Sequence, residues 1–408
     1  ASNATQLYID GTPAGTPGTL VFGSDTAARV TFGAETGGAE AYNGLMDEIR
    51  ISDAVRSAAW IEAEVCTAGG VVAGTTHTIE GTVYEDVNAD ANLADSVARP
   101  GADVILFRDN GDNNPNGGDV FVNGTTTNPS GNYAFSGLAD GTYWVFVDST
   151  TVSPSAGLIG VQGDVWAEQT YGTAGAWCAD GAGGTTERAG AGACFGGKTG
   201  NTSDDSTGLA TAEHLVRVTV SGGNVSSVDF GFSFNAVTNI LAGDAQDDDG
   251  SFNRTVQGSL RQFIQNANAI TGTNAMRFVP AVATNASGSG GNWWRIAVTN
   301  PLPDISDAGI TIDGTAYDRA DGATVVNPNA GQVGSGGTVG VDGLTLDRVE
   351  RPELELNGQD AFAASGLVVD AASATIRNLA LNSFGTDALN AQIWVTPSAT
   401  PAAGEAVI

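Results

Sequence analysis

Residues 77–86 read HTIEGTVYED, and residues 141–148 read GTYWVFVD. In both stretches apolar or aromatic residues alternate with polar ones or form a short run, which is typical of β-strands with a buried face. Three further stretches share this character: DVILF (103–107), NYAFSGL (132–138) and HLVRVTV (214–220). Together with VDFGFSF at 228–234, they predict one β-sheet module over residues 77–235.

The length of 408 residues exceeds what one core normally organises, so we expect several domains. The 57 glycines favour many short strands joined by tight turns. The expected segments are a β module at 1–66, a small-residue linker at 67–76, the sheet module at 77–235, an acidic linker at 236–254 and a second β-rich region at 255–408.

The charge of the chain is strongly acidic. Asp and Glu number 46 against 16 Lys and Arg, which gives a formal net charge of −30. Such a surface repels nucleic acid and anionic lipid and favours divalent cations. We therefore expect no nucleic-acid partner, and because no apolar run is long enough to cross a bilayer, no membrane insertion in this segment.

The clearest predicted helix reads SLRQFIQNANAI over residues 259–270. Ser259, with Gln262 three residues later, has the pattern of a capping box. Leu260, Phe263, Ile264 and Ala267 fall on one face of this helix. After it the chain repeats short apolar strands separated by turns, with a spacing similar to the coils of a solenoid.

The first segment resembles the C-terminal half of a laminin-G-like (concanavalin-A-like) jelly roll. The matching residues are LYIDG at 7–11 and YNGLMDEIRISDAVRSAAWIEAEV at 42–65. The resemblance assigns no site residues, because the family's ligand and calcium positions lie partly in the other half of that domain.

The second segment resembles the B-type domains of serine-aspartate repeat surface proteins and collagen adhesins of bacteria. The resemblance lies in GTVYEDVNADANLAD (81–95), RPGADVILFRDNGD (99–112) and VDFGFSF (228–234). It implies an immunoglobulin-like β-sandwich that acts as a stalk and is often stabilised by calcium.

The third segment resembles the opening coils of a right-handed parallel β-helix. SLRQFIQNANA (259–269) followed by LPDISDAGITIDG (302–314) carries this resemblance. It implies that the helix caps the open end of the first coil and protects its edge. The predicted fold is therefore mainly β: a partial jelly roll, an immunoglobulin-like B-type sandwich, and N-terminal coils of a right-handed parallel β-helix with a capping helix.

Two acidic loops in the sheet module are candidate calcium sites, because calcium prefers six to eight oxygen ligands. The first loop offers Asp86, Asn88, Asp90, Asn92 and Asp95. It departs from the helix-loop-helix calcium pattern, since no Gly follows Asp90 and Val97 stands where a bidentate Glu is expected. The alternative for this loop is a turn without a ligand, held by its own side chains.

The second acidic loop offers Asp109, Asp112, Asn114 and Asp119 within RDNGDNNPNGGD. It is either a second calcium site, a part of the first, or a hydrophilic hairpin loop.

Cys178 and Cys194 flank a Gly-rich loop, and we expect them to form a disulfide. A disulfide indicates an oxidising compartment. The alternative is two unrelated thiols, and Cys66 is the third cysteine of the chain.

Catalytic patterns are weak. The only histidines, His77 and His214, are expected at strand edges or on the surface. The carboxylates of the last region resemble turn residues more than a hydrolytic pair: Asp304, Asp307, Asp313 and Asp318. Of the adjacent Trp293 and Trp294, one should face inward and one outward, and the outward ring either packs near the helix or stacks on a sugar.

These patterns predict a non-enzymatic, extracellular structural or adhesive segment of a bacterial surface protein or surface fibre. Its expected cofactor is structural calcium. Its expected partners are other copies or further domains of the same protein, surface glycans, or proteins of host or neighbouring cells. The alternative is a carbohydrate-active protein, with a polysaccharide lyase or glycosidase on the β-helix and a jelly-roll binding domain.

Overall fold

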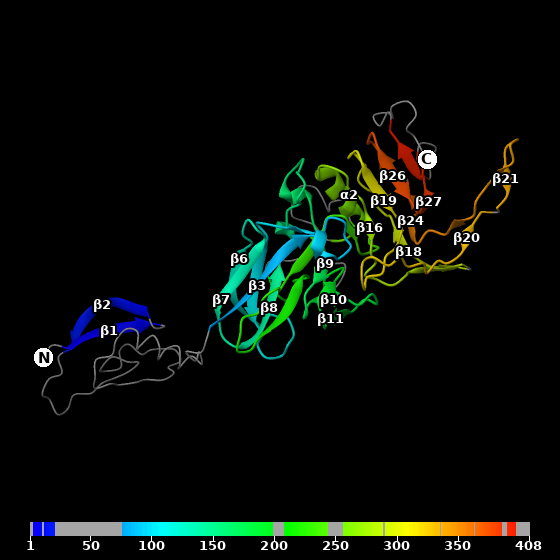
Figure 1. Ribbon diagram of the computed structural model, residues 1–408. Helices are drawn as coiled ribbons and strands as arrows, with labels where there is room; N and C mark the ends of the chain where they lie inside the picture. Colours follow the sequence, from blue (N-terminus) through cyan, green and yellow to red (C-terminus); the bar gives the residue numbers. More distant parts are fainter. Residues whose placement is uncertain are drawn as a thin grey trace. The chain divides into compact units, whose positions relative to one another are not determined.

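The computed structural model describes residues 3–9, 12–20, 76–198, 208–243, 256–288, 290–334, 336–362, 364–385 and 390–396. The chain divides into two compact units, residues 1–76 and 77–408 (Figure 1). In the first unit, β1 (Asn3–Ile9) pairs antiparallel with β2 (Thr12–Leu20). Residues 21–66 of the predicted jelly roll, Cys66 included, lie outside the described residues.

The second unit begins with two β-sheets. The larger sheet has the order β12-β9-β14-β3-β4, and β7 also pairs with β3. The smaller sheet has the order β13-β8-β5-β6 and is antiparallel throughout. The strands of the larger sheet are β3 (His77–Glu85), β4 (Val97–Ala98), β7 (Asn132–Leu138), β9 (Glu168–Gly172), β12 (Gly192–Ala193) and β14 (Phe230–Ser233); those of the smaller are β5 (Asp103–Arg108), β6 (Val120–Thr126), β8 (Gly141–Val147) and β13 (Leu215–Val220).

The two sheets form a β-sandwich because their inward side chains share one hydrophobic core. In β3 every second residue is buried, Ile79 and Val83 among them, as the predicted alternation requires. The opposite sheet contributes Val104, Leu106 and Val145 to the same core. This core confirms the β-sheet module that the alternating stretches predicted, and its two packed sheets agree with the β-sandwich that the resemblance implied.

Strand β8 is buried on both faces, which explains its unbroken apolar run. Tyr143, Val145 and Val147 face the main core. Trp144 and Phe146 face a smaller cluster with Leu209, Ala212 and Leu215 on the other side of the sheet. No local pattern predicts this second cluster, because its covering residues Leu209, Ala212 and Leu215 lie more than 60 positions away along the chain.

A different pattern follows the sandwich. β18 (Gly291–Ala297), β24 (Leu354–Phe362) and β27 (Leu379–Phe384) pair in parallel, with Trp294, Leu354 and Leu379 in register. Two more parallel pairs are β19 (Ile310–Asp313) with β26 (Ala374–Arg377), and β25 (Leu367–Val369) with β28 (Ile393–Val395). Successive passes of the chain therefore lie beside one another in this parallel-strand region, drawn from yellow to red in Figure 1.

The parallel strands enclose a second hydrophobic core. Phe263 and Ile264 of α2 (Leu260–Ala269) pack into it with Ile296, Leu356 and Phe278. Trp294 is buried there and Trp293 is only half-buried, which confirms the predicted alternation. The side chain of Ser259 accepts a hydrogen bond from Gln262 N at 3.1 Å, so Ser259 caps the helix as expected. The other half of the predicted capping box is not formed, because the side chain of Gln262 donates to Asn266 Oδ1.

Shorter elements complete the second unit. β15 (Ala236–Val237), inside the predicted 236–254 linker, pairs in parallel with β16 (Arg277–Phe278) and contributes Val237 to the second core. The other elements are the 3₁₀ helices Leu93–Asp95, Ser149–Thr151 and Gln162–Asp164, and the antiparallel pairs β10 (Trp177–Ala179) with β11 (Thr185–Glu187), β17 (Ala286–Gly288) with β18, β20 (Gln332–Val333) with β23 (Val349–Glu350), and β21 (Thr338–Val339) with β22 (Leu344–Thr345). None of the helices within the described ranges is long and apolar enough to span a bilayer.

Candidate functional site

The first acidic loop is organised around a buried carboxylate. Asp86 is 1 % exposed, and its oxygens accept hydrogen bonds from Asp90 N at 3.2 Å and Ala91 N at 2.8 Å. Burial raises the pKa of Asp86 to about 6, although these hydrogen bonds oppose the rise. Asp86 therefore holds the backbone of the loop from inside.

The other predicted ligands of this loop meet at an amide nitrogen. Asn88 Nδ2 donates to Asp90 Oδ2 at 3.1 Å and to Asp95 Oδ2 at 3.2 Å, while Asn92 Oδ1 accepts from Ala94 N and caps the following 3₁₀ helix. The Asn88 amide thus bridges the carboxylates of Asp90 and Asp95.

The second acidic loop gathers its carboxylates more closely. One oxygen each from Asp109, Asp112 and Asp119 lies within 4.8 Å of the others. Within the part of the chain that the structure describes, this is the one group of three or more acidic, histidine or cysteine side chains that comes so close together. The predicted fourth ligand, Asn114, is exposed and donates its side-chain amide to Asp112 O at 3.1 Å.

Backbone amides hold these carboxylates in place. Asp119 accepts from Asn110 N at 2.9 Å and from Asn116 N at 2.8 Å. Asp112 accepts from Asn114 N at 2.8 Å, and this bond helps to lower the pKa of Asp112. An oxygen-only cluster of charged side chains matches the ligand preference of calcium, so the donor set of the second loop fits this ion better than that of the first.

A polar cluster that the sequence analysis missed joins the sandwich to the parallel-strand region. His214 is buried, and its ring nitrogens lie 3.0 Å from Gln169 Oε1 and 3.2 Å from Gln257 Oε1. The amide nitrogen of Gln257 donates to Ser149 Oγ at 3.0 Å and to Ala167 O. His214 directly precedes β13, as expected, but the expectation of a surface position is wrong, because residues from both regions cover it.

Glu168 belongs to the same cluster. Its carboxylate accepts from Thr238 Oγ1 at 3.0 Å and from Gln169 N at 2.7 Å. Burial raises the pKa of Glu168 to about 7, and the nearby charge of His214 limits this rise. A carboxyl group and an imidazole are thus enclosed where the two regions meet.

The polar face of α2 completes this joint. Asn266 Oδ1 accepts from Trp166 N at 2.8 Å, and Asn266 Nδ2 donates to Trp166 O at 2.9 Å and to Phe234 O at 3.0 Å. We call Glu168, His214, Gln257 and Asn266 the buried joint. The helix does cover the second core, but its opposite face is buried against the sandwich. One signal was available in the sequence: this face carries amides, with Arg261 the only charge in the helix.

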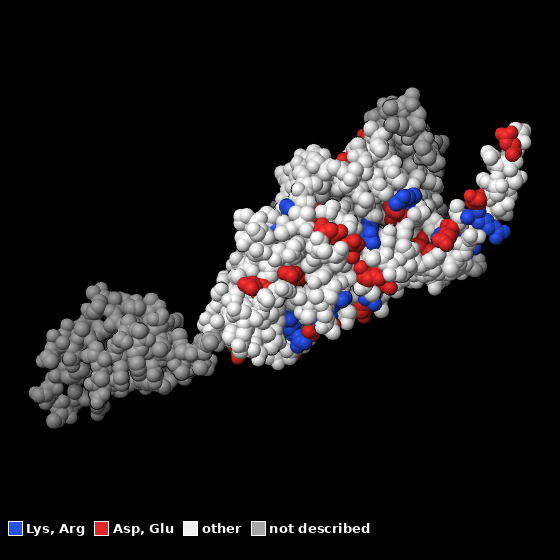
Figure 2. All heavy atoms as spheres, viewed as in Figure 1, with Lys and Arg blue, Asp and Glu red and all other residues white. Residues whose placement is uncertain are grey.

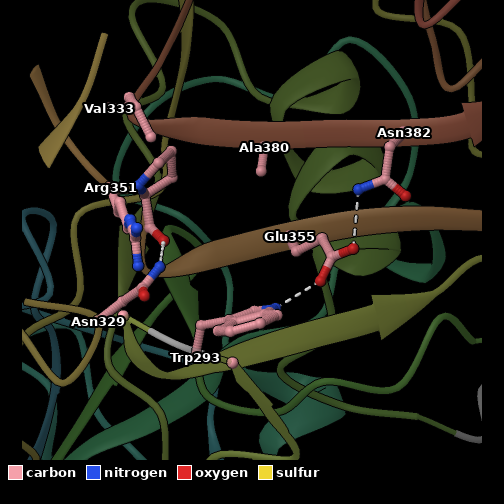
Figure 3. Close-up of a pocket in the computed structure, with 10 residues that line it drawn as sticks. Trp293, Asn329, Val333, Arg351, Glu355, Ala380 and Asn382 are labelled. Carbon is pink, nitrogen blue, oxygen red and sulfur yellow. Dashed lines mark hydrogen bonds between the residues drawn. The ribbon is translucent and has the colours of Figure 1, made fainter. Parts of the chain in front are cut away.

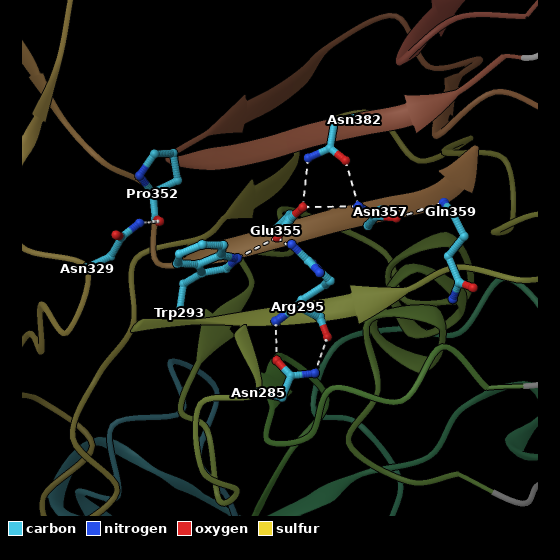
Figure 4. Close-up of polar contacts among 9 residues, drawn as sticks. All are labelled: Asn285, Trp293, Arg295, Asn329, Pro352, Glu355, Asn357, Gln359 and Asn382. Atoms are coloured by element: carbon cyan, nitrogen blue, oxygen red, sulfur yellow. Dashed lines mark hydrogen bonds and ion pairs between the residues drawn. The ribbon is translucent and has the colours of Figure 1, made fainter. Parts of the chain in front are cut away.

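A second polar network lies on the parallel strands (Figure 4). Glu355 Oε1 accepts from Asn382 Nδ2 at 2.8 Å and from Asn357 Nδ2 at 3.2 Å. Glu355 Oε2 accepts from Arg295 Nε at 2.7 Å and from Trp293 Nε1. Burial alone would raise the pKa of Glu355, but these four donors outweigh it and lower the pKa to about 2. Glu355 is thus a fixed anion and is poorly suited to proton transfer near neutral pH.

The carboxylates considered for catalysis take part in turns or loop contacts. Asp313 Oδ1 accepts from Thr315 N at 3.0 Å, and Asp313 Oδ2 pairs with Arg377 Nε at 2.8 Å. Asp318 accepts from Ala320 N, Asp307 accepts from Asn274 Nδ2, and the backbone carbonyl of Asp304 accepts from Asn268 Nδ2. His77 Nε2 lies 3.3 Å from Asp140 Oδ1, at the start of β3.

Cys178 and Cys194 are joined in a disulfide, as the sequence analysis expected. Both cysteines are buried and belong to the main sandwich core. The bond therefore links β10, which contains Cys178, to the end of β12, the strand of the larger sheet that Cys194 directly follows.

Comparison with known proteins adds one family match. The concanavalin A-like lectin/glucanases superfamily matches residues 1–62, which agrees with the resemblance of the first segment. Among solved structures, the major pilin subunit of Bacillus cereus is similar over 38% of this chain and 30% of the pilin, with 14% identity and a TM-score of 0.17. The shaft pilin of Lactobacillus rhamnosus GG is similar over 43% of this chain and 56% of that chain, with 11% identity and a TM-score of 0.19. These TM-scores are too low to indicate a shared overall fold.

Proposed function

We propose that this chain is an extracellular structural and adhesive segment of a bacterial surface protein or surface fibre. The buried joint is the observation that carries the proposal. It connects the sandwich and the parallel-strand region through hydrogen bonds between buried groups, such as Asn266 with Trp166 and Glu168 with Thr238. Such a connection transmits force between neighbouring domains better than a flexible linker does.

The disulfide supports the extracellular part of the proposal. Structural disulfides persist in secreted and surface proteins and are rare in the reducing cytosol of most organisms. The acidic surface supports it as well, because Asp and Glu side chains outnumber Lys and Arg on the described face in Figure 2. A high net charge keeps an extended protein soluble and separates neighbouring copies that are not specifically paired.

We assign a fold type to each of the three segments from the families that their sequences resemble. The two antiparallel-rich sheets support an immunoglobulin-like B-type sandwich, and the parallel ladder β18-β24-β27 supports the first coils of a right-handed β-helix. The superfamily match supports a lectin-like first module. In this proposal the sandwich serves as a stalk, and other copies or further domains of the same protein are its partners.

Calcium is proposed as a structural ligand of the stalk. Asp109, Asp112 and Asp119 would hold it, because their oxygens already converge between β5 and β6. Calcium would relieve the repulsion among three carboxylates and stiffen the loop. The first acidic loop could bind only if the Asn88 amide turned its oxygen toward Asp90 and Asp95.

Surface labelling tests this function. An antibody raised against the chain should label intact cells of the producing organism, and permeabilising the cells should add little signal. An antibody to a cytoplasmic protein, which should label only permeabilised cells, is the control. Labelling that appears only after permeabilisation would overturn the proposal.

A further inference from the structure

A groove of about 390 Å³ opens on the parallel-strand region. Figure 3 shows Arg351 and Asn329 on one side of it, Trp293 below, and Glu355 with Asn382 on the other side. The residues come from β18, β24, β27 and the segments before β24. The groove therefore combines an indole ring, two amides, a guanidinium and a carboxylate.

The carboxylate of Glu355 is fully engaged by the wall of the groove. Four donors from Trp293, Arg295, Asn357 and Asn382 use its two oxygens, and the ion pair with Arg295 at 2.7 Å offsets its charge. Glu355 fixes the edge of the Trp293 ring through the indole nitrogen. This network holds the groove in shape before any ligand arrives, which reduces the entropy cost of binding.

Unlike the carboxylate of Glu355, the guanidinium of Arg351 is not bound to the other described side chains of the groove. It has neither a hydrogen-bond acceptor nor a carboxylate partner among the described residues, although 46 Asp and Glu are present in the chain. Gly290 makes room for it, because a Cβ at that position would lie 1.0 Å from Arg351 Nη1. An arginine with five donors and no partner is suited to a planar anion such as a carboxylate.

Asn329 provides a second unfulfilled group beside this guanidinium. Its side-chain nitrogen donates to Pro352 O at 2.9 Å, but its Oδ1 is buried without a donor. Buried polar atoms of this kind cost free energy, and they are retained where they have a purpose. A small shift of the Asn329 side chain would present this acceptor to a hydroxyl group in the groove.

We infer that this groove binds a saccharide that carries a carboxylate, such as a uronic acid residue of a glycan. Arg351 would take the carboxylate, the exposed part of the Trp293 ring would lie against the sugar ring, and the amides of Asn329 and Asn382 would bond its hydroxyls. The inference rests on the proposed adhesive role and names the chemical class of one glycan that the segment recognises.

Titration of the full chain with three probes tests this inference. A tetrasaccharide of alternating glucuronate and N-acetylglucosamine should bind, whereas cellotetraose, which is neutral, and tetraglutamate, which is an acidic peptide, should bind at least about tenfold more weakly. Equal binding of the neutral sugar or of the peptide would overturn the assignment, as would no binding of the acidic sugar at millimolar concentration. None of these results would alter surface labelling, so the two proposals fail separately.

Two variants place the binding in this groove. R351Q should weaken binding of the acidic tetrasaccharide at least about tenfold, because it removes the charge and keeps a polar side chain of similar length. R348Q, which changes an exposed arginine three residues earlier, should leave the affinity within about twofold. Equal affinities of R351Q and the unchanged protein would overturn the inference.

A measurement on the unchanged protein guards against misfolding of R351Q. The indole N–H resonance of Trp293, assigned by its loss in W293F, should shift on addition of the acidic tetrasaccharide. That of the adjacent Trp294, which is buried and donates to Val282 O at 2.9 Å, should not shift. A titration that moves neither resonance would contradict binding in the groove.

Discussion

The second acidic loop and the buried joint use similar side chains in opposite environments. In the loop, Asp112 is exposed, and the backbone amide of Asn114 is the main cause that lowers its pKa. In the joint, Glu168 is buried and loss of solvent raises its pKa to about 7. The comparison shows that surroundings set the charge of a carboxylate in this protein: a hydrogen bond favours the ionised form of Asp112 at the surface, and burial favours the protonated form of Glu168 in the joint.

Substitutions in the buried joint should lower the free energy of unfolding more than substitutions elsewhere. In Asn266→Ala, Trp166 N, Trp166 O and Phe234 O lose their buried partner, so we expect the free energy of unfolding to fall by about 3–5 kcal/mol. Denaturant titration of the full chain measures it. Asn268→Ala is the matched control, because Asn268 bonds only within the parallel-strand region. A loss below about 1 kcal/mol in Asn266→Ala would show that the joint contributes little.

The joint should also make stability depend on pH. The pKa of Glu168 is about 7 in the folded chain and near 4.5 when unfolded, so between these values the folded state holds an extra proton. Its stabilising effect, about 3 kcal/mol, is complete below pH 4.5 and is lost as the pH rises through 7. Asp86, whose pKa burial raises to about 6, contributes a slope of the same sign.

The variant Glu168→Gln isolates this effect. It keeps a hydrogen-bonding side chain and cannot titrate, so its free energy of unfolding should change less between pH 4.5 and 7.5 than that of the unchanged protein. Denaturant titrations at several pH values compare the two chains. If their slopes coincide, Glu168 does not keep its raised pKa.

The second acidic loop should give a smaller, ligand-dependent effect. Calcium at ten times its dissociation constant should stabilise the sandwich by about 1.4 kcal/mol. Thermal unfolding with calcium and with chelator measures this, and Asp112→Asn should abolish the difference. The matched variant Asp95→Asn in the first loop should retain it. If Asp95→Asn loses the calcium effect and Asp112→Asn keeps it, the ion binds at the first loop.

The smallest effect concerns the backbone of the first loop. Ala91 has a φ of 62°, a left-handed conformation that costs about 1 kcal/mol for a residue with a Cβ. Ala91→Gly should therefore stabilise the chain by about 0.5 kcal/mol, less than the full strain because glycine also gains freedom in the unfolded state. Thermal unfolding measures the change, and a decrease in stability would mean that the Ala91 side chain makes a contact that matters.

The same comparison explains what could be predicted from the sequence. The acidic loop, the Ser259 cap and the Cys178–Cys194 pair were visible because their residues lie at most 16 positions apart. The joint was invisible because it brings together residues such as Trp166 and Asn266, which are 100 positions apart. Local spacing carries no information about which distant elements meet. The amphipathic pattern therefore predicted the apolar face of α2 that packs on the second core, but not that its polar face is buried against the sandwich.

In the groove, strand alternation predicted that one of Trp293 and Trp294 faces outward, but it did not predict the residues that bond the outward ring of Trp293. Glu355 reaches Trp293, and Asn382 reaches Glu355, only because β24 pairs with β18 and β27 with β24 in a register that no local pattern reveals. The surroundings of Asp86 were hidden for a different, local reason. Ala89 and Ala91 adopt a positive φ, which no residue pattern indicated, and the amides of Asp90 and Ala91 in the same turn donate to the Asp86 carboxylate.

The central claim is that the sandwich and the parallel-strand region behave as one continuous segment. Native-state hydrogen exchange, followed peptide by peptide in the full chain, tests this most directly. We predict that peptides covering β8 and β14 and peptides covering α2 and β18 exchange with the same opening free energy, and that Asn266→Ala lowers both. If α2 and β18 open at a much lower free energy than the sandwich in the unchanged protein, and Asn266→Ala leaves β8 and β14 unaffected, the two regions are independent and the account is contradicted.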